Sequence, residues 1–464
     1  MSGNREKVAV IGFGVTGKSV AKFLLSKDVD VHVFDSKKRD SFDPVELQKF
    51  LDVTFHFETN DFDPTEYAYL VTSPGASLEI SPIKKALALG VPVHNDLTLF
   101  IEAWRKIGKI VGVTGSNGKT TTVSLMYEAL KKITPTILAG NIGNSPLDLL
   151  DIGYPKGVVA VLEISSYQLE LFRPEHYLDV CVVTNLSSNH LDRYNGSMLE
   201  YGAAKLRGID KKKTKTIVCA DDPGTQKYLL NQIKCDQVFV VSFEIATDQI
   251  ILPGIYIDRN NALIFKSNPK LDCDVIFDKI ENRKLIGIHN LYNISFILLT
   301  IKLLDLEVNN SVINIIRSFD SLEHRLEKVT EKNGVVYVND SKSTSPDSIR
   351  VALEALGNNK NIILIAGGDD KDMSFDYLAE FFSEKVKNLI IIPGEISKKL
   401  IKAAKASENV PINETNNLAE ATTFAAKIAE VGDVVLLSPG SYSKNYFKDY
   451  KDRGNKFKEF VRAL

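Results

Sequence analysis

A glycine-rich loop near residue 115 carries the strongest chemical signal in the sequence. A predicted strand, KIVGV, runs into TGSNGKTT (114–121), and a helical pattern follows. In such a loop the backbone N–H groups hold phosphates, a lysine reaches the β- and γ-phosphates, and a hydroxyl binds Mg²⁺. The spacing departs from GxxxxGK[ST], because Val113 stands at the first glycine position. ATP is still the expected ligand, and the residues predicted to contact it are Gly115, Ser116, Asn117, Gly118, Lys119, Thr120 and Thr121.

A second glycine pattern lies close to the N-terminus. Strand VAVI is followed by GFGVTG (12–17), then a helix, then strand VHVF and Asp35. This is the GxGxxG arrangement with an acidic residue about 20 positions later, which places a diphosphate at a helix N-terminus and lets the acid accept from a ribose or base. Two interpretations stay open, a nucleotide site or a tight strand-to-helix turn with packing glycines.

Alternating strands and helices must position these loops. Short β-branched runs alternate with helical patterns along the chain, which predicts an α/β fold with mainly parallel sheets. At about 150 residues per domain, 464 residues predict roughly three domains. We place them at 1–98, 99–320 and 321–464, the first Rossmann-like and the second P-loop ATPase-like. Within the second, residues 238–285 are expected to form an antiparallel patch.

Composition excludes several classes of protein. The formal charge is −2, so no overall field attracts the chain to nucleic acid or an anionic membrane. With 44% apolar and 25% charged residues, it is typical of a folded globular protein. The start of the chain lacks a signal-peptide core, and no apolar run spans a bilayer, so a cytoplasmic location is expected. The widely spaced cysteines indicate reduced thiols rather than disulfides or a zinc site: Cys181, Cys219, Cys235 and Cys273.

The ordered motifs together resemble the Mur ligase family. The likeness runs from end to end through TGSNGKTT, GNIG, LEISSYQLE, NHLDRY, YGAAKLRG, GIHNLYN, HRLE, NDSKSTSP and LLSPGSYS. The resemblance, strongest to the glutamate-adding branch, implies an ATP-dependent ligase of peptidoglycan precursor synthesis. Such an enzyme joins D-glutamate to UDP-N-acetylmuramoyl-L-alanine through an acyl phosphate. It also implies a Rossmann-like C-terminal domain that binds the amino acid, and a monomer is expected.

The resemblance assigns metal-binding and catalytic roles. Glu163 ends the apolar strand VVAVLE, where a carboxylate can face the P-loop, and the family makes it a Mg²⁺ ligand. Lys205 matches a lysine that is carbamylated in these ligases, although the bare sequence predicts a solvated helix lysine. Two Mg²⁺ sites are expected, with Mn²⁺ as an alternative ion, and their ligands are Thr120, Glu163, His190 and carbamylated Lys205. The expected catalytic residues are Lys119, His190, Lys205 and Lys342.

Further residues match the family's substrate sites. Asn290 and Asn293 resemble the asparagines beside ATP, and Arg325, Asp340 and Lys342 would close on it from the C-terminal domain. The implied UDP-substrate contacts are Val15, Thr16, Asp35, Ser36, Lys37, Ser73, Pro74, Gly75, Asn141 and His190. The implied amino-acid contacts are Thr344, Lys371, Ser443 and Tyr450. Asn189, Lys444 and Asn445 depart from the family pattern.

Three other functions compete with this interpretation. GFGVTG and Asp35 alone would fit an NAD-dependent oxidoreductase, but the GKT loop would then be unexplained. Another Mur-type or folylpolyglutamate-type ligase, with a different amino acid such as L-glutamate, would keep the ATP loop. A catalytically silent scaffold would explain the departures at Asn189 and Lys444. Intact Lys119, Thr120 and Glu163 argue against that last alternative.

Overall fold

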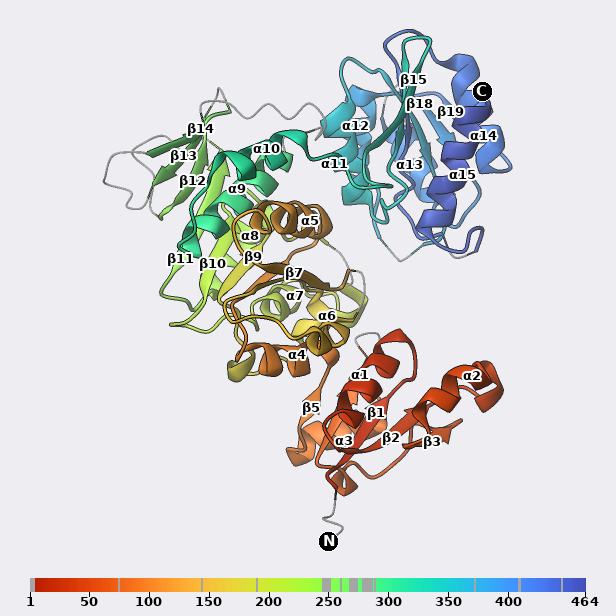
Figure 1. The fold of residues 1–464 in the computed structure, drawn as a ribbon. Helices are drawn as coiled ribbons and strands as arrows, with labels where there is room; N and C mark the ends of the chain where they lie inside the picture. The colour runs from red at the N-terminus through yellow and green to blue at the C-terminus, as the bar shows by residue number, and fades with distance from the viewer. Residues whose placement is uncertain are drawn as a thin grey trace.

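Three α/β domains follow one another along the chain (Figure 1). The computed structural model describes residues 5–73, 76–142, 145–188, 191–243, 252–258, 261–266, 274–277, 287, 289–370, 373–407, 410–443 and 445–464. Each domain is built on its own sheet, and helices cover the sheet faces. The predicted class, three α/β domains with mostly parallel sheets, is confirmed.

The N-terminal sheet is entirely parallel, with the order β3-β2-β1-β4-β5. The strand order reverses between β1 and β4, and ligands of open α/β sheets bind where this happens. Gly17 must be glycine, since a Cβ there would lie 1.9 Å from the carbonyl oxygen of Gly12. The elements are β1 (Lys7–Ile11), α1 (Val15–Leu25), β2 (Asp30–Asp35), α2 (Pro44–Leu47), β3 (Val53–Phe57), β4 (Tyr69–Thr72), α3 (Ser81–Leu89) and β5 (Val93–His94).

The central sheet has the order β14-β13-β12-β11-β10-β9-β6-β8-β7 among the described residues. Its strands are β6 (Ile110–Thr114), β7 (Thr136–Gly140), β8 (Val159–Glu163), β9 (Val180–Val183), β10 (Lys215–Cys219), β11 (Val238–Phe243), β12 (Gly254–Ile257), β13 (Leu263–Lys266) and β14 (Asp274–Phe277). Its helices are α4 (Asp96–Trp104), α5 (Lys119–Leu130), α6 (Ser166–Leu169), α7 (Met198–Lys205), α8 (Pro223–Tyr228), α9 (His289–Leu303) and α10 (Asn310–Ser318).

The prediction of an antiparallel patch over 238–285 is partly wrong. β11 pairs in parallel with both β10 and β12, and antiparallel pairing begins only between β12 and β13. Gly254, which follows Pro253, is the first residue of β12 and pairs with Val240. Residues 278–285 lie outside the described residues.

The C-terminal sheet has the order β15-β16-β20-β17-β18-β19, and only β15 is antiparallel to its neighbour. Because β16 and β20 are adjacent and parallel, the loops that follow them meet at one sheet edge. The strands are β15 (Glu327–Lys332), β16 (Val335–Asn339), β17 (Ile362–Ala366), β18 (Val386–Ile391), β19 (Ile412–Glu414) and β20 (Val434–Leu437). The helices are α11 (Pro346–Leu356), α12 (Leu378–Lys385), α13 (Ser397–Ala406), α14 (Leu418–Ile428) and α15 (Tyr450–Ala463).

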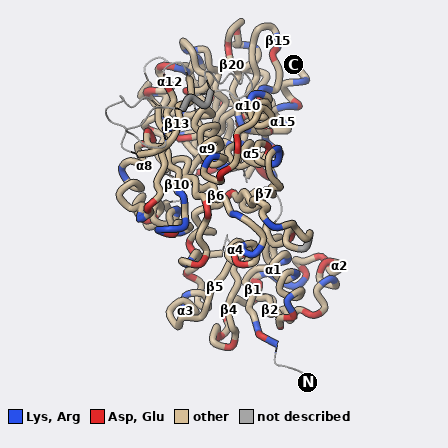
Figure 2. Tube along the Cα trace, turned by 60° about the vertical axis from the view of Figure 1, so that its left-hand side comes forward, with Lys and Arg blue, Asp and Glu red and all other residues tan. Residues whose placement is uncertain are grey.

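One predicted domain boundary falls inside a helix, and the other falls between two elements. Residue 98 lies inside α4, whereas residue 320 lies between α10 and β15. Apolar side chains of α1, α4 and β6 share one buried cluster, so the N-terminal and central domains pack continuously. Acidic and basic residues are mixed along all three domains (Figure 2). No helix of the described part of the chain is long and apolar enough to cross a membrane.

Candidate active site

The phosphate loop has the strand-loop-helix geometry that the sequence predicts. β6 ends at Thr114, and α5 begins at Lys119 after Gly118, whose φ of 83° is left-handed. Gly115 has a φ of 139°, and a Cβ there would lie 2.0 Å from the Thr184 hydroxyl oxygen. No side chain caps the N-terminus of α5. Its first N–H groups therefore form an anion-binding site.

Two buried lysines converge on this loop. Lys119 Nζ donates to the carbonyl oxygens of Gly115 at 2.7 Å and Ser116 at 2.9 Å. Lys205 Nζ, on the last residue of α7, donates to the same Gly115 oxygen at 3.0 Å. Burial, together with repulsion from Lys205, lowers the pKa of Lys119 to about 8. Burial lowers the pKa of Lys205 to about 7. Two lysines at one phosphate-binding loop are suited to a polyanion.

Lys205 is not the solvated helix lysine that its local sequence predicts. Its side chain is 1% exposed and lies over the ring of Tyr201, 4.4 Å from the centroid. Within the described residues it forms no ion pair with a carboxylate. A buried amine without a counter-ion favours its neutral form.

Glu163 is a buried carboxylate at the end of β8. It ends β8, pairs in register with Val113 of β6, and is 4% exposed. One carboxylate oxygen accepts from Asn141 Nδ2 at 3.3 Å, while the other is buried without any hydrogen-bond partner. A buried, unsatisfied carboxylate oxygen is costly unless a cation binds it. Glu163 and the hydroxyl of Thr120 therefore fit Mg²⁺, which prefers oxygen ligands. His190 and Asn189 lie outside the described residues.

The C-terminal domain reaches into this site. Arg325 Nη2 donates to Thr120 Oγ1 at 2.7 Å. Burial and repulsion from Arg325 lower the pKa of Lys342 to about 8, and its Nζ lies 5.1 Å from the ring centroid of Tyr450. Burial raises the pKa of Asp340 to about 7. Cations from two domains thus face one loop, which is the arrangement that phosphoryl transfer needs.

A cleft lies between the central and C-terminal domains beside the loop. On its central wall, Asn293 Oδ1 accepts from Thr122 Oγ1 at 3.0 Å, and Asn293 Nδ2 donates to Asn290 Oδ1 at 3.0 Å. The cleft brings together most of the predicted ATP contacts: Asn117, Gly118, Thr121, Asn290, Asn293, Arg325, Asp340 and Lys342.

The first glycine loop forms a separate site in the N-terminal domain. Asp35 accepts from the backbone N–H of Phe13 at 2.7 Å and of Lys37 at 2.9 Å, so it joins the loops after β1 and β2. Ser73 Oγ donates to the carbonyl oxygen of Ile11 at 3.4 Å. Of the predicted contacts at this edge, Val15, Ser36 and Lys37 are exposed and Thr16 is half-buried. Pro74 and Gly75 lie outside the described residues, and Asn141 lies beside Glu163 in the central domain.

Two of the predicted amino-acid contacts lie in the loops that follow the adjacent strands β16 and β20. Thr344 follows β16, Ser443 follows β20, and Tyr450 begins α15. At the position of one departure from the family pattern, Asn445 donates through its backbone N–H and its Nδ2 to the Asp369 carboxylate at 3.2 and 2.7 Å. The hydrogen bonds of Asn445 therefore connect the loop after β20 to the loop after β17. Lys371 and Lys444 lie outside the described residues.

Some contacts at the site could not be found from sequence patterns. Asp347, in the first turn of α11, accepts from Asn117 Nδ2 at 2.7 Å across the domain interface. Tyr201 OH lies 3.3 Å from Ser116 Oγ. Arg453 is fully buried between the loops that carry Thr344 and Ser443. An isolated aspartate, tyrosine or arginine on an amphipathic helix gives no sequence signal for such roles.

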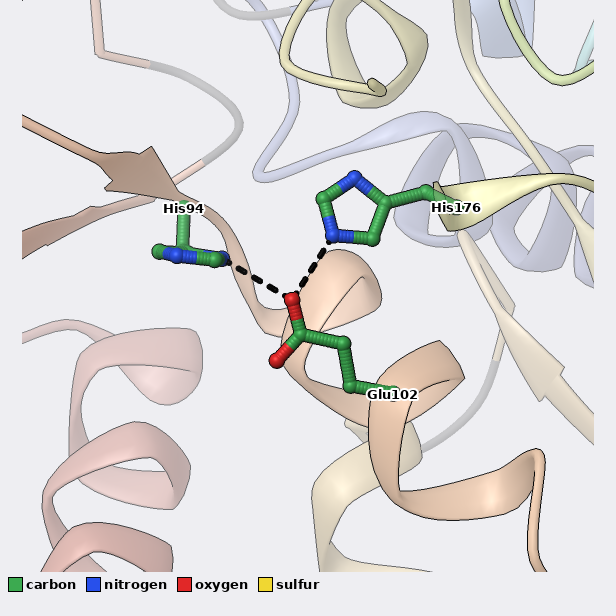
Figure 3. A group of neighbouring side chains, drawn as sticks. All are labelled: His94, Glu102 and His176. Carbon is green, nitrogen blue, oxygen red and sulfur yellow. Dashed lines mark hydrogen bonds and ion pairs between the residues drawn. The ribbon is translucent and has the colours of Figure 1, made fainter. Parts of the chain in front are cut away.

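His94, Glu102 and His176 form a second polar cluster (Figure 3). His94 ends β5, Glu102 lies on α4, and His176 lies in the 3₁₀ turn Pro174–His176. His176 Nδ1 accepts from the N–H of Arg173 at 3.0 Å, so its ring proton is on Nε2, which donates to Glu102 Oε1 at 2.8 Å. A metal-binding imidazole has the opposite pattern, with its second nitrogen acting as a donor. The cluster is therefore a hydrogen-bonded contact between segments rather than a metal centre.

Comparisons with known proteins match each of the three domains. The family model of the MurD-like N-terminal domain of Mur ligases matches residues 6–95, the Mur ligase middle domain matches 113–300, and the Mur ligase glutamate ligase domain matches 324–440. The UDP-N-acetylmuramoylalanine--D-glutamate ligase of Pelotomaculum thermopropionicum is 34% identical and that of Geotalea daltonii 33% identical. Each match covers 99% of this chain and 98% of the relative.

Solved structures share the fold at lower identity. MurF ligase from Thermotoga maritima, in complex with ADP, has a TM-score of 0.57 at 19% identity and covers 99% of this chain and 96% of that chain. UDP-N-acetylmuramate-alanine ligase MurC from Thermotoga maritima has a TM-score of 0.55 at 20% identity, covering 98% and 99%. Three domain models and full-length relatives agree, and this chain belongs to the Mur ligase family.

Proposed function

We propose that the protein is an ATP-dependent ligase that joins D-glutamate to UDP-N-acetylmuramoyl-L-alanine. The observation that carries the proposal is the convergence of Lys119, Lys205, Arg325 and Lys342 around one phosphate loop beside the unsatisfied carboxylate of Glu163. The relatives that match over the whole chain are named for this reaction, which supports the choice of substrates.

The first step is phosphoryl transfer. A carboxylate oxygen of UDP-N-acetylmuramoyl-L-alanine attacks the γ-phosphorus of ATP, the bond to the bridging oxygen breaks, and ADP leaves. Lys119 of the central domain and Arg325 of the C-terminal domain would contact the phosphates and stabilise the negative charge that develops on the transferred group. Domain closure excludes water, which would otherwise hydrolyse the acyl phosphate.

The second step forms the amide bond. The amine nitrogen of the amino acid attacks the acyl carbon, and a tetrahedral intermediate collapses with loss of inorganic phosphate and a proton. Lys342 lies next to Tyr450, at the boundary between the ATP cleft and the proposed amino-acid pocket. Its charge can therefore stabilise both the transferred phosphoryl group and the oxyanion of the tetrahedral intermediate. Thr344, Lys371, Ser443 and Tyr450 would hold the amino acid.

Mg²⁺ would be held by Thr120 and Glu163, with His190 and carbamylated Lys205 completing two sites. Bound there, the ion neutralises phosphate charge during transfer. Carbamylation is supported by the environment of Lys205, because only a neutral amine nitrogen attacks CO₂, and burial without a counter-ion favours that form. The UDP moiety would bind at the loops around Gly12, Asp35 and Ser73.

Lys119→Ala tests the proposal. Removing this cation should lower ATP-dependent phosphate release by orders of magnitude, with the circular dichroism spectrum unchanged. Lys131→Ala, at the C-terminal cap of the same helix and paired with Glu128 at the surface, is the matched control and should keep wild-type turnover. Equal turnover of Lys119→Ala and the wild type would overturn the assignment of the phosphate loop.

A further inference from the structure

Arg453 occupies an unusual environment in the C-terminal domain. It lies on α15, three residues after Tyr450, and its side chain is 0% exposed. Its guanidinium donates to Ser341 Oγ at 3.1 Å, to the Ser341 carbonyl oxygen at 2.8 Å, and to the Ser441 carbonyl oxygen at 3.0 Å. A longer contact of 3.4 Å reaches the Tyr442 carbonyl oxygen.

These acceptors belong to the two loops that form the proposed amino-acid pocket. Ser341 precedes Lys342 and Thr344 in the loop after β16, and Ser441 precedes Ser443 in the loop after β20. Ser341 Oγ also donates to the carbonyl oxygen of Tyr450 at 2.8 Å. One guanidinium therefore joins the three segments that carry the described members of the pocket.

The charge of Arg453 is not cancelled by a direct partner. Its hydrogen-bond acceptors are neutral oxygens, and it forms no ion pair with any carboxylate in the described part of the chain. Asp369, one of the nearer acids, is already held by Asn445. The carboxylates of Asp369 and Asp340 favour its charge through space, without a direct ion pair.

We propose that Arg453 is a positioning residue for the amino-acid pocket, which fixes the loops of Thr344 and Ser443 and does not itself touch the substrate. The proposal rests on the proposed function. Arginine suits the role because its planar fork holds several acceptors at fixed angles, which lysine cannot reproduce. Loss of hydrogen bonds to a charged group costs about 1.5–3 kcal/mol, equivalent to roughly 10- to 100-fold.

Steady-state kinetics of Arg453→Lys and Ser341→Ala test this role. Arg453→Lys keeps the positive charge but loses the planar guanidinium, so KM for D-glutamate should rise about tenfold or more. KM for ATP and KM for UDP-N-acetylmuramoyl-L-alanine should stay within about twofold of wild type. Ser341→Ala removes one acceptor and should raise KM for D-glutamate severalfold. Arg462→Lys, exposed on the same helix, is the matched control and should leave all three KM values unchanged.

Two outcomes would overturn the proposal. One is an unchanged KM for D-glutamate in folded Arg453→Lys, and the other is an equal rise in the KM of all three substrates, which indicates a merely structural role. If Arg453→Lys does not fold, the same comparison of KM values in Ser341→Ala tests the positioning role. Failure of the proposed function is distinguishable, because the wild type would then release no phosphate in response to D-glutamate.

Discussion

Asn117 Nδ2 donates to Asp347 Oδ2 at 2.7 Å, and this hydrogen bond joins the phosphate loop to the first turn of α11 in the C-terminal domain. Arg325 makes a second connection to the same loop through Thr120. Asp347 is itself fixed by Arg350, whose Nε donates to its other oxygen at 2.9 Å. Two hydrogen bonds therefore connect the C-terminal domain to the loop that is proposed to bind phosphates.

Asp347→Ala should loosen this closure. Losing the contact removes a hydrogen bond to a charged group, so KM for ATP should rise about tenfold, and small-angle X-ray scattering should show a larger radius of gyration. Asp376→Ala removes an exposed ion pair with Lys402 in the same domain and should change neither quantity. Identical scattering and KM values for Asp347→Ala and wild type would show that the contact does not control closure.

Glu163→Gln should abolish tight Mg²⁺ binding while preserving the shape of the side chain. The amide still occupies the space beside Asn141 but carries no charge for the cation. We expect turnover to fall about 100-fold and the Mg²⁺ concentration for half-maximal activity to rise. A Mg²⁺ titration of phosphate release measures both, and a titration curve that coincides with wild type would exclude Glu163 as a metal ligand.

Lys205→Ala should be inactive and partly rescued by acetate or formate, which can occupy the place of the carbamate. The pKa of Lys205 is lowered to about 7, so its amine becomes neutral, and reactive toward CO₂, as the pH rises through that value. In ¹³C-labelled bicarbonate, the carbamate signal of the wild type should therefore grow between about pH 6 and about pH 8. Absence of both the signal and the rescue in folded protein would contradict carbamylation.

The cluster of His94, Glu102 and His176 should make the fold sensitive to acid. Burial lowers the pKa of His94 to about 4, so between that value and its usual 6.5 the folded state binds fewer protons than the unfolded state. The free energy of unfolding should therefore fall as pH drops through this window, as urea denaturation can measure. His94→Gln should reduce this loss. Zn²⁺ should not raise the melting temperature, and a rise that His94→Gln abolishes would show a metal site instead.

Local chemistry was readable from the sequence, whereas contacts between distant segments were not. The strand, glycines and lysine of the phosphate loop are neighbours in the chain, and their geometry follows from residue type. The burial of Lys205 depends on Gly115, 90 residues away, and Arg453 reaches Ser341 across 112 residues. The parallel direction of β12 beside β11 is likewise a property of strand pairing that residue types alone did not predict.

The identity of the added amino acid tests the central claim most directly. Phosphate release and product mass would be measured with ATP and UDP-N-acetylmuramoyl-L-alanine while D-glutamate, L-glutamate and D-aspartate are exchanged. The account predicts release with D-glutamate alone and a product that carries one additional glutamyl residue. Release with L-glutamate instead, or no release with any of the three, would contradict it.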